Sequence, residues 1–182
     1  MDRAQSDFAR VYSEHVWHIY GFLAYRVGNR ELAEDLTQAT FERALRAWSR
    51  FDRRRASERT WLLAIARNLQ IDQIRRDRHR HTEELDDVRG PTVPGPEERF
   101  DAAGALNEAL GKLNQRDREV LALRYGADLT GPEISDLLGL SLANVQQILS
   151  RSLRKLRDLL QAPAGSGLER ARGSERREQN QH

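Results

Sequence analysis

Apolar residues recur with a helical period along most of the chain, and no long segment alternates with period two. In the first half they form three stripes, over residues 8–23, 32–48 and 61–69. Gly28 is suited to end the first helix, Asn29 to cap the second and Ser57 to cap the third. The pattern therefore predicts three helices before residue 80, the first running from about Ser6 to Val27.

The second half predicts a linker, four more helices and a tail. Prolines and glycines interrupt residues 81–96, which also carry a high proportion of acids. A fourth helix is expected to begin near Glu97 and a fifth at an Asn114 cap, ending at Tyr125-Gly126. Two further helices are expected near 131–139 and 142–160, and residues 162–182 hold too little apolar surface to fold.

These elements predict an all-α fold of two small helical domains. The first, residues 1–80, is expected to have three to four helices. A flexible acidic linker, 81–96, joins it to a second helical domain, 97–161, and a disordered tail, 162–182, follows.

Composition narrows the classes of function. The 182 residues include no cysteine, which excludes disulfides, thiolate metal sites and a cysteine nucleophile. Charged residues make up 32% of the chain, against about 25% in a typical domain. The longest apolar runs fall far short of the roughly 20 residues of a membrane span, and the N-terminal residues lack a signal-peptide core. We expect a cytoplasmic protein without membrane insertion.

Charge is unevenly distributed although the net charge is only +2. Residues 50–80 hold ten arginines and four acids, whereas residues 82–101 hold seven acids and two arginines. A basic block followed by an acidic one suggests two different kinds of contact. A patchy solvated surface is the alternative interpretation.

Residues 130–148 carry the signals of a helix-turn-helix. Thr130 and Glu133 have the spacing of a capping box, and Gly139 permits the left-handed backbone that a sharp turn needs. Small Ser135 lies where the two helices would cross. Apolar residues stand where the helices would touch, at Ile134, Leu138, Leu140, Val145 and Ile148. An ordinary αα-hairpin shares part of this pattern, but the short first helix and the arginine-rich second one favour DNA binding.

In such a motif the start of the second helix faces base edges in the major groove. The residues available there are Ser141, Ala143, Asn144, Gln146 and Gln147. Amide side chains can bind adenine and alanine can contact a thymine methyl. Basic residues further along suit phosphates, namely Arg151, Arg154, Lys155 and Arg157. An exposed polar face without a ligand is the alternative for either glutamine alone.

The third helix carries a polar stripe at helical spacing, formed by Asn68, Asp72, Arg75 and His79, with Arg76 beside it. Ion pairs of Asp72 with Arg75 or Arg76 are the default interpretation. They do not explain Asn68, a weak helix former in mid-helix. Beside an arginine-rich loop, the stripe predicts a second nucleic-acid surface.

The order of these motifs resembles the extracytoplasmic-function group of bacterial RNA polymerase sigma factors, the two-domain kind. Three segments carry the resemblance in the first domain: residues 33–41 (AEDLTQATF), 60–68 (TWLLAIARN) and 72–76 (DQIRR). In the second domain it rests on residues 113–125 and 133–141. The resemblance covers about residues 8–160. It implies promoter-specific transcription initiation with core RNA polymerase, including help in melting the DNA, and no catalysis or cofactor of its own.

The resemblance also implies residue roles. Core polymerase would contact Asp35, Gln38, Phe41 and Arg43 through the clamp helices of its largest subunit, although Phe41 could equally be a core residue. The −10 element would contact Arg53, Arg54, Arg55, Ser57, Asn68, Asp72, Arg75 and Arg76, with one base flipped into the loop at a cost of a few kcal/mol. The helix-turn-helix would bind the −35 element, and the flap of the second-largest subunit is a further partner. An anti-sigma protein commonly covers the polymerase-binding surfaces in this group.

Some features depart from the family or leave other functions open. Residues 144–148 (NVQQI) replace the usual Thr-Val-Lys/Arg-Ser-Arg pattern, which suggests a different −35 preference. A free-standing regulator that binds palindromic operators as a dimer is one alternative function, but it leaves the first domain unexplained. An enzyme is the other, although the sequence shows no Gly-rich phosphate loop or triad. His15 and His18 lack partners at metal-ligand spacing, so no metal site is expected.

Overall fold

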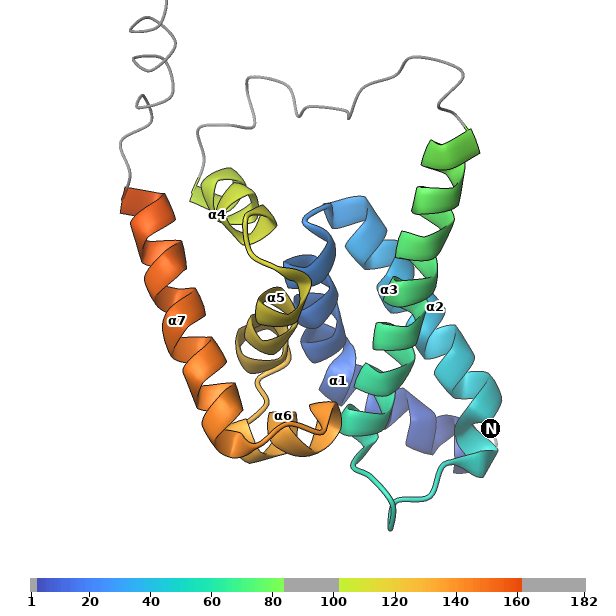
Figure 1. Cartoon of the computed structure of the whole chain (residues 1–182). Coiled ribbons are helices and arrows are strands. Elements are labelled where there is room, and N and C mark those ends of the chain that lie inside the picture. The colour runs from blue at the N-terminus through green and yellow to red at the C-terminus, as the bar shows by residue number, and fades with distance from the viewer. Residues whose placement is uncertain (1–2, 84–101, 162–182) are drawn as a thin grey trace, which may run out of the picture.

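The computed structural model describes residues 3–83 and 102–161, and all regular structure within these ranges is helical (Figure 1). The first module consists of α1 (Arg3–Val27), α2 (Arg30–Ala47), the 3-10 turn η1 (Trp48–Arg50) and α3 (Glu58–Glu83). The second module consists of α4 (Ala102–Gly111), α5 (Gln115–Leu121), the π-helical turn η4 (Ala122–Gly126), α6 (Gly131–Leu138) and α7 (Leu142–Gln161). The predicted all-α class is confirmed.

Several predicted boundaries fall outside the described residues. These are the start of the fourth helix near Glu97, most of the linker 81–96 and the whole tail 162–182. Residues 81–83 are still helical, so α3 runs past the expected domain end at residue 80.

Local signals fix the helix ends of the first module. Gly28 adopts a φ of +65°, and the Asn29 side chain accepts a hydrogen bond from the Leu32 amide at 2.8 Å. The Ser57 hydroxyl accepts one from the Thr60 amide at 3.1 Å. Asn29 and Ser57 thus cap α2 and α3 as the sequence predicts.

The fifth helix differs from its prediction. The helix α5 begins at the expected Asn114 cap but ends at Leu121, and the chain continues as the π-helical turn η4 to Gly126. The Ala127 amide accordingly bonds to the Ala122 carbonyl at 2.9 Å, five residues back. This wider turn brings Gly126 against the first module.

The two modules pack against each other through α1. This helix lies centrally, with α2 and α3 on one side and α5 and η4 on the other (Figure 1). Gly21 of α1 meets Gly126 of η4 backbone to backbone, because a Cβ built on Gly21 would lie 2.3 Å from the Gly126 carbonyl oxygen. Fully buried side chains of both modules, among them Phe22 and Leu123, belong to one continuous core.

Three arginines of the first module bond to the second module around this contact. Arg26 donates to the Gln115 carbonyl at 2.7 Å. Arg67 donates to Glu119 at 2.5 Å, and Arg59 donates to Glu133 at 3.0 Å. We call the Gly21–Gly126 contact and these three arginine bonds the module interface.

Candidate nucleic-acid and protein interfaces

The helix-turn-helix has the geometry that its caps predict. The amide and the hydroxyl of Thr130 both donate to the Glu133 carboxylate, each at 2.7 Å. These two bonds, with a smaller contribution from Arg59, lower the pKa of Glu133. Gly139 takes a left-handed conformation with φ of 64° between α6 and α7. The Ser141 hydroxyl accepts from the Asn144 amide at 3.2 Å and caps α7. The second helix is therefore set at a defined angle to the first.

The predicted base-reading residues lie at the exposed start of α7. The exposed members of this set are Ser141, Ala143, Gln146 and Gln147. Asn144 is half-buried, and the neighbouring Val145 and Ile148 are buried. One face of α7 therefore packs against the rest of the second module, and the face that carries Gln146 and Gln147 stays exposed. That face is free for a ligand although the modules are packed together.

Two of the four predicted phosphate contacts on α7, Arg151 and Arg154, have different surroundings. Arg151 donates to Asp117 of α5 at 2.6 Å, and Asp117 is only 6% exposed. Arg154 is exposed on the same helix. Arg151 therefore helps to attach α7 to α5, in addition to any contact with phosphate.

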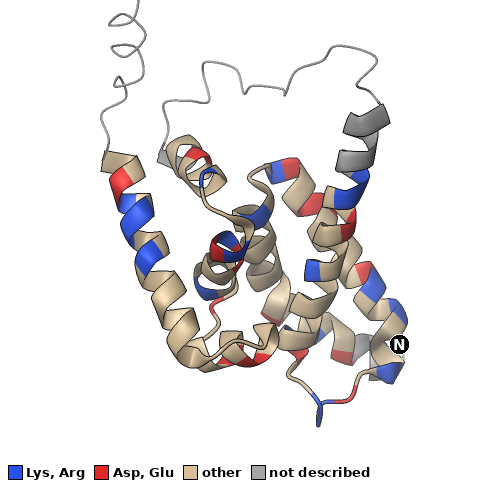
Figure 2. Cartoon of the chain, viewed as in Figure 1, with Lys and Arg blue, Asp and Glu red and all other residues tan. Residues whose placement is uncertain are grey.

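The predicted −10 residues form an exposed basic surface on the first module. We call residues 51–57 the basic loop. Its charged tip projects from the same end of the molecule as α6 (Figures 1 and 2). The exposed members of the predicted set are Arg53, Arg54, Arg55, Ser57, Asn68, Arg75 and Arg76. Asp72 is half-buried, and its carboxylate lies 4.0 Å from the Arg75 guanidinium. The described side chains do not include His79.

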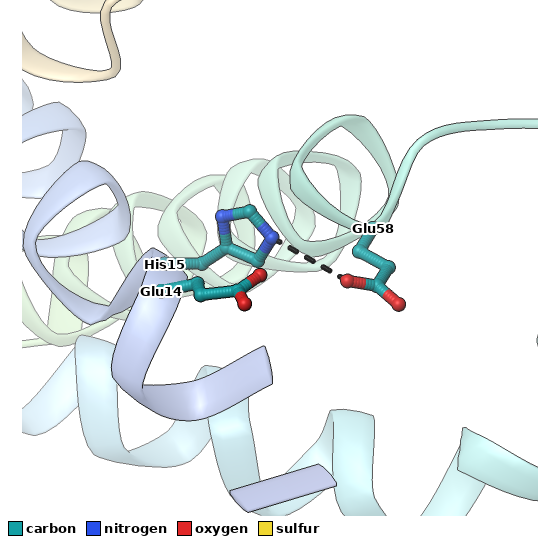
Figure 3. Close-up of side chains that lie close together, drawn as sticks. All are labelled: Glu14, His15 and Glu58. Carbon is teal, nitrogen blue, oxygen red and sulfur yellow. Dashed lines mark ion pairs between the residues drawn. The ribbon is translucent and has the colours of Figure 1, made fainter. Parts of the chain in front are cut away.

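Glu58, the first residue of α3, collects cationic side chains from α1 and the basic loop. Arg10 and Arg53 both donate to its carboxylate, at 2.8 and 3.0 Å. Burial of Glu58 opposes ionisation, but these two bonds outweigh it and lower the pKa of the Glu58 carboxyl. The His15 imidazole points toward the same carboxylate, with Nε2 3.6 Å from Oε2 (Figure 3). Burial lowers the pKa of His15, and the nearby carboxylates offset this only in part.

The ligand atoms of Glu14, His15 and Glu58 lie within 4.8 Å of one another, close enough for a divalent metal (Figure 3). Two guanidinium groups already bond Glu58 Oε1. A metal ion would add positive charge beside them. The arrangement therefore favours an ion-pair cluster.

The predicted polymerase contacts lie on α2 beside an apolar groove. Asp35, Gln38 and Arg43 are exposed, whereas Phe41 is only 5% exposed. Phe41 packs edge-on against Tyr12 at 4.8 Å between ring centroids and lies at a groove of about 670 Å³ between α1 and α2. Of the two interpretations of Phe41, the structure supports the core residue.

Two features of the structure are not predicted by the sequence patterns. One is the exposed rim of this groove, where Trp17 is 75% and Leu45 is 52% exposed. An aromatic residue off the buried stripe was the available signal for Trp17. The other is the module interface, whose residues resemble ordinary helix residues in the sequence. No helix among the described residues has the length and apolar character of a membrane span.

Each of the two modules matches a known protein family. Residues 11–80 match sigma-70 region 2, and residues 109–158 match sigma-70 region 4. The ECF RNA polymerase sigma factor SigM of Bacillus subtilis is 30% identical over 156 residues, covering 82% of this chain and 92% of SigM. The ECF RNA polymerase sigma factor BldN of Streptomyces coelicolor is 33% identical over 171 residues, and the match covers 88% of this chain but only 64% of BldN.

A solved structure shares the fold. The sigma factor RpoE of Bartonella quintana, in complex with the anti-sigma factor NepR, superposes with a TM-score of 0.67 at 22% identity. The match covers 86% of this chain and 98% of RpoE. At this identity the likeness concerns the fold alone.

Proposed function

The chain belongs to the ECF group of RNA polymerase sigma factors, and from this premise we propose how its residues direct promoter-specific transcription initiation. Core polymerase performs the chemistry, and this chain supplies promoter recognition and assists DNA melting, in the cytoplasm. The observation that carries the proposal is the presence, on one chain, of a basic loop on a region 2 module and an exposed reading face on a region 4 helix-turn-helix.

The −35 element is the proposed ligand of α7, with Ser141, Ala143, Asn144, Gln146 and Gln147 toward the bases and Arg151 and Arg154 toward phosphates. The −10 element is the proposed ligand of the basic loop and of the exposed stripe on α3. Clamp helices of the polymerase would contact Asp35, Gln38 and Arg43, and the buried Phe41 would line the adjacent groove. The flap of the second-largest subunit is the proposed partner of the second module. An anti-sigma protein is a further proposed partner, which would compete with core polymerase for these surfaces.

Simultaneous reading of both elements requires the modules to separate. Elements centred about 25 base pairs apart are separated by roughly 85 Å at about 3.4 Å per base pair. A compact chain of this length has a radius of gyration of about 16 Å. We therefore propose that binding to core polymerase opens the module interface and holds the two modules at promoter spacing.

Replacing Gln146 or Gln147 by alanine should remove base preference in the −35 region. A bidentate amide–base contact contributes about 1–3 kcal/mol of discrimination, so each variant should lose selectivity of that size at one base pair. The measurement is the transcribed fraction of a promoter library with randomised −35 positions. Gln161→Ala, at the exposed far end of α7, is the matched control. Unchanged −35 preferences in both variants would contradict the assignment.

Charge reversal at Asp35 should weaken binding to core polymerase by at least about tenfold, because a like-charge contact at an interface costs several kcal/mol. Asp7→Arg tests the same change at an exposed acid of another helix, α1, outside the predicted contact set. Competition against labelled wild-type chain for core polymerase gives both affinities. Equal losses for Asp35→Arg and Asp7→Arg would remove Asp35 from the interface.

A further inference from the structure

We infer that Arg53 is a positioning residue that anchors the basic loop through Glu58, and that Arg54 and Arg55 supply the phosphate contacts of this loop. The inference rests on the proposed function, because it divides roles among arginines assigned together to the −10 element. We call the side chains of Arg10, His15, Arg53 and Glu58 the Glu58 clasp.

Glu58 joins three parts of the first module. Its side chain is only 13% exposed, and its Oε1 accepts from Arg10 Nη2 at 2.8 Å and from Arg53 Nε at 3.0 Å. Arg53 Nη2 lies 2.9 Å from the same oxygen. His15 approaches Oε2 from α1 (Figure 3). The clasp therefore connects α1, the basic loop and the start of α3.

Arg53 has a second partner at the base of the loop. Its guanidinium lies 5.8 Å from the centre of the Trp48 ring, within cation–π range. Trp48 stacks on Phe51 at 5.3 Å, and Phe51 contacts Trp61 of α3 at 4.7 Å. Arg53 is thus held between a carboxylate and an aromatic cluster on which the loop rests.

Arg54 and Arg55 are placed differently. The Arg54 side chain is 90% exposed, and its partner Asp52 belongs to the loop itself. Arg55 is exposed as well, and its amide bonds to the Asp52 carbonyl at 3.0 Å. An exposed ion pair contributes little to stability, so Arg54 can exchange Asp52 for a phosphate at small cost.

The same exchange by Arg53 would be unfavourable. Its departure would leave the largely buried Glu58 carboxylate with fewer donors, and a buried charged acceptor that loses a partner is destabilised. The basic loop would also lose its connection to α1. Arg53 is therefore expected to keep its position when DNA binds.

Salt dependence distinguishes an anchoring arginine from one that contacts phosphate. The slope of log K against log salt is negative, and each phosphate contact removed makes it less steep by about one. The experiment measures binding of a fluorescent promoter by the holoenzyme at several salt concentrations. The variants are Arg53→Gln, Arg54→Gln, Arg55→Gln, Glu58→Gln and the Arg53→Gln/Glu58→Gln double.

We expect Arg54→Gln and Arg55→Gln each to reduce the slope by about one. Arg53→Gln and Glu58→Gln should keep the wild-type slope and lower affinity about 2- to 10-fold, the cost of ordering a freed loop side chain on binding. The double variant should lose no more than the larger single loss, because both changes break one cluster. A slope change for Arg53→Gln equal to that of Arg54→Gln would overturn the inference, as would wild-type affinity.

A second measurement does not require DNA. Amide hydrogen exchange of residues 52–57 in the free chain should be faster in Arg53→Gln and Glu58→Gln than in wild type, and unchanged in Arg55→Gln. Equal exchange in all four proteins would overturn the clasp. Wild-type slopes for both Arg54→Gln and Arg55→Gln would instead contradict the DNA role of the basic loop, and exchange would still decide whether the clasp exists.

Discussion

Replacing Gly21 by alanine should separate the two modules. The added Cβ would lie 2.3 Å from the Gly126 carbonyl oxygen and 3.0 Å from its carbon, and backbone atoms cannot move aside as a flexible side chain can. Overpacking of this kind costs about 1–3 kcal/mol, which corresponds to a shift of roughly 5- to 150-fold toward the open form. Alanine also favours the helix more than glycine does, so α1 itself should not be weakened.

The chain is well suited to measuring this opening because it contains no cysteine. Spin labels on Glu31→Cys and Arg157→Cys, both at exposed positions, report the distance between modules. We expect a longer and broader distribution in Gly21→Ala, and tighter apparent binding to core polymerase because less free energy is needed for opening. Gly111→Ala, where a Cβ meets no atom within 4 Å, is the matched control. An unchanged distribution in Gly21→Ala would contradict the role of this contact.

Replacing Arg26 by methionine should strongly destabilise the closed chain. Arg26 is 7% exposed, and burial lowers its pKa. It donates to the side-chain oxygen of buried Gln70 at 2.9 Å and to the Gln115 carbonyl at 2.7 Å. Its loss leaves the buried Gln70 oxygen without this donor, at about 1–3 kcal/mol. It also removes the bond to Gln115, an exposed residue whose carbonyl can bond water instead, at about 0.5–1.5 kcal/mol. We expect the free energy of unfolding, measured in urea, to fall by about 1.5–4.5 kcal/mol.

A second substitution shows whether the loss comes from the unpaired acceptor. Replacing Gln70 by methionine as well removes one of the two acceptors, and an apolar pair of similar size can be nearly neutral. The Arg26→Met/Gln70→Met double should therefore recover part of the stability lost by Arg26→Met. A midpoint for Arg26→Met equal to that of the parent would show that this buried network contributes nothing.

Local structure was predictable because the residues that determine it are adjacent in sequence. Asn29 and Asn114 cap helices, and Gly139 turns the chain, each through bonds or backbone angles within a few residues. The exposed amide face of α7 followed from the same helical period. The elements that present the candidate site could thus be read from short segments.

The module interface was not predictable in this way. Gly21 and Gly126 are 105 residues apart in the sequence, and nothing near either glycine indicates a partner. Arg26 has the sequence context of an exposed arginine near the end of a helix, yet its partners lie 44 and 89 residues away. Phe41 shows the same limit, because an apolar residue at the edge of a stripe fits a core or a partner equally well.

The most direct test of the account mixes the purified chain with bacterial core RNA polymerase, follows co-elution by gel filtration, and then assays run-off transcription from a promoter library. We expect co-elution and new, sequence-dependent transcripts that share a −10 and a −35 element. Failure to co-elute, together with tight binding of the chain alone to palindromic operators, would contradict the account and support a free-standing regulator.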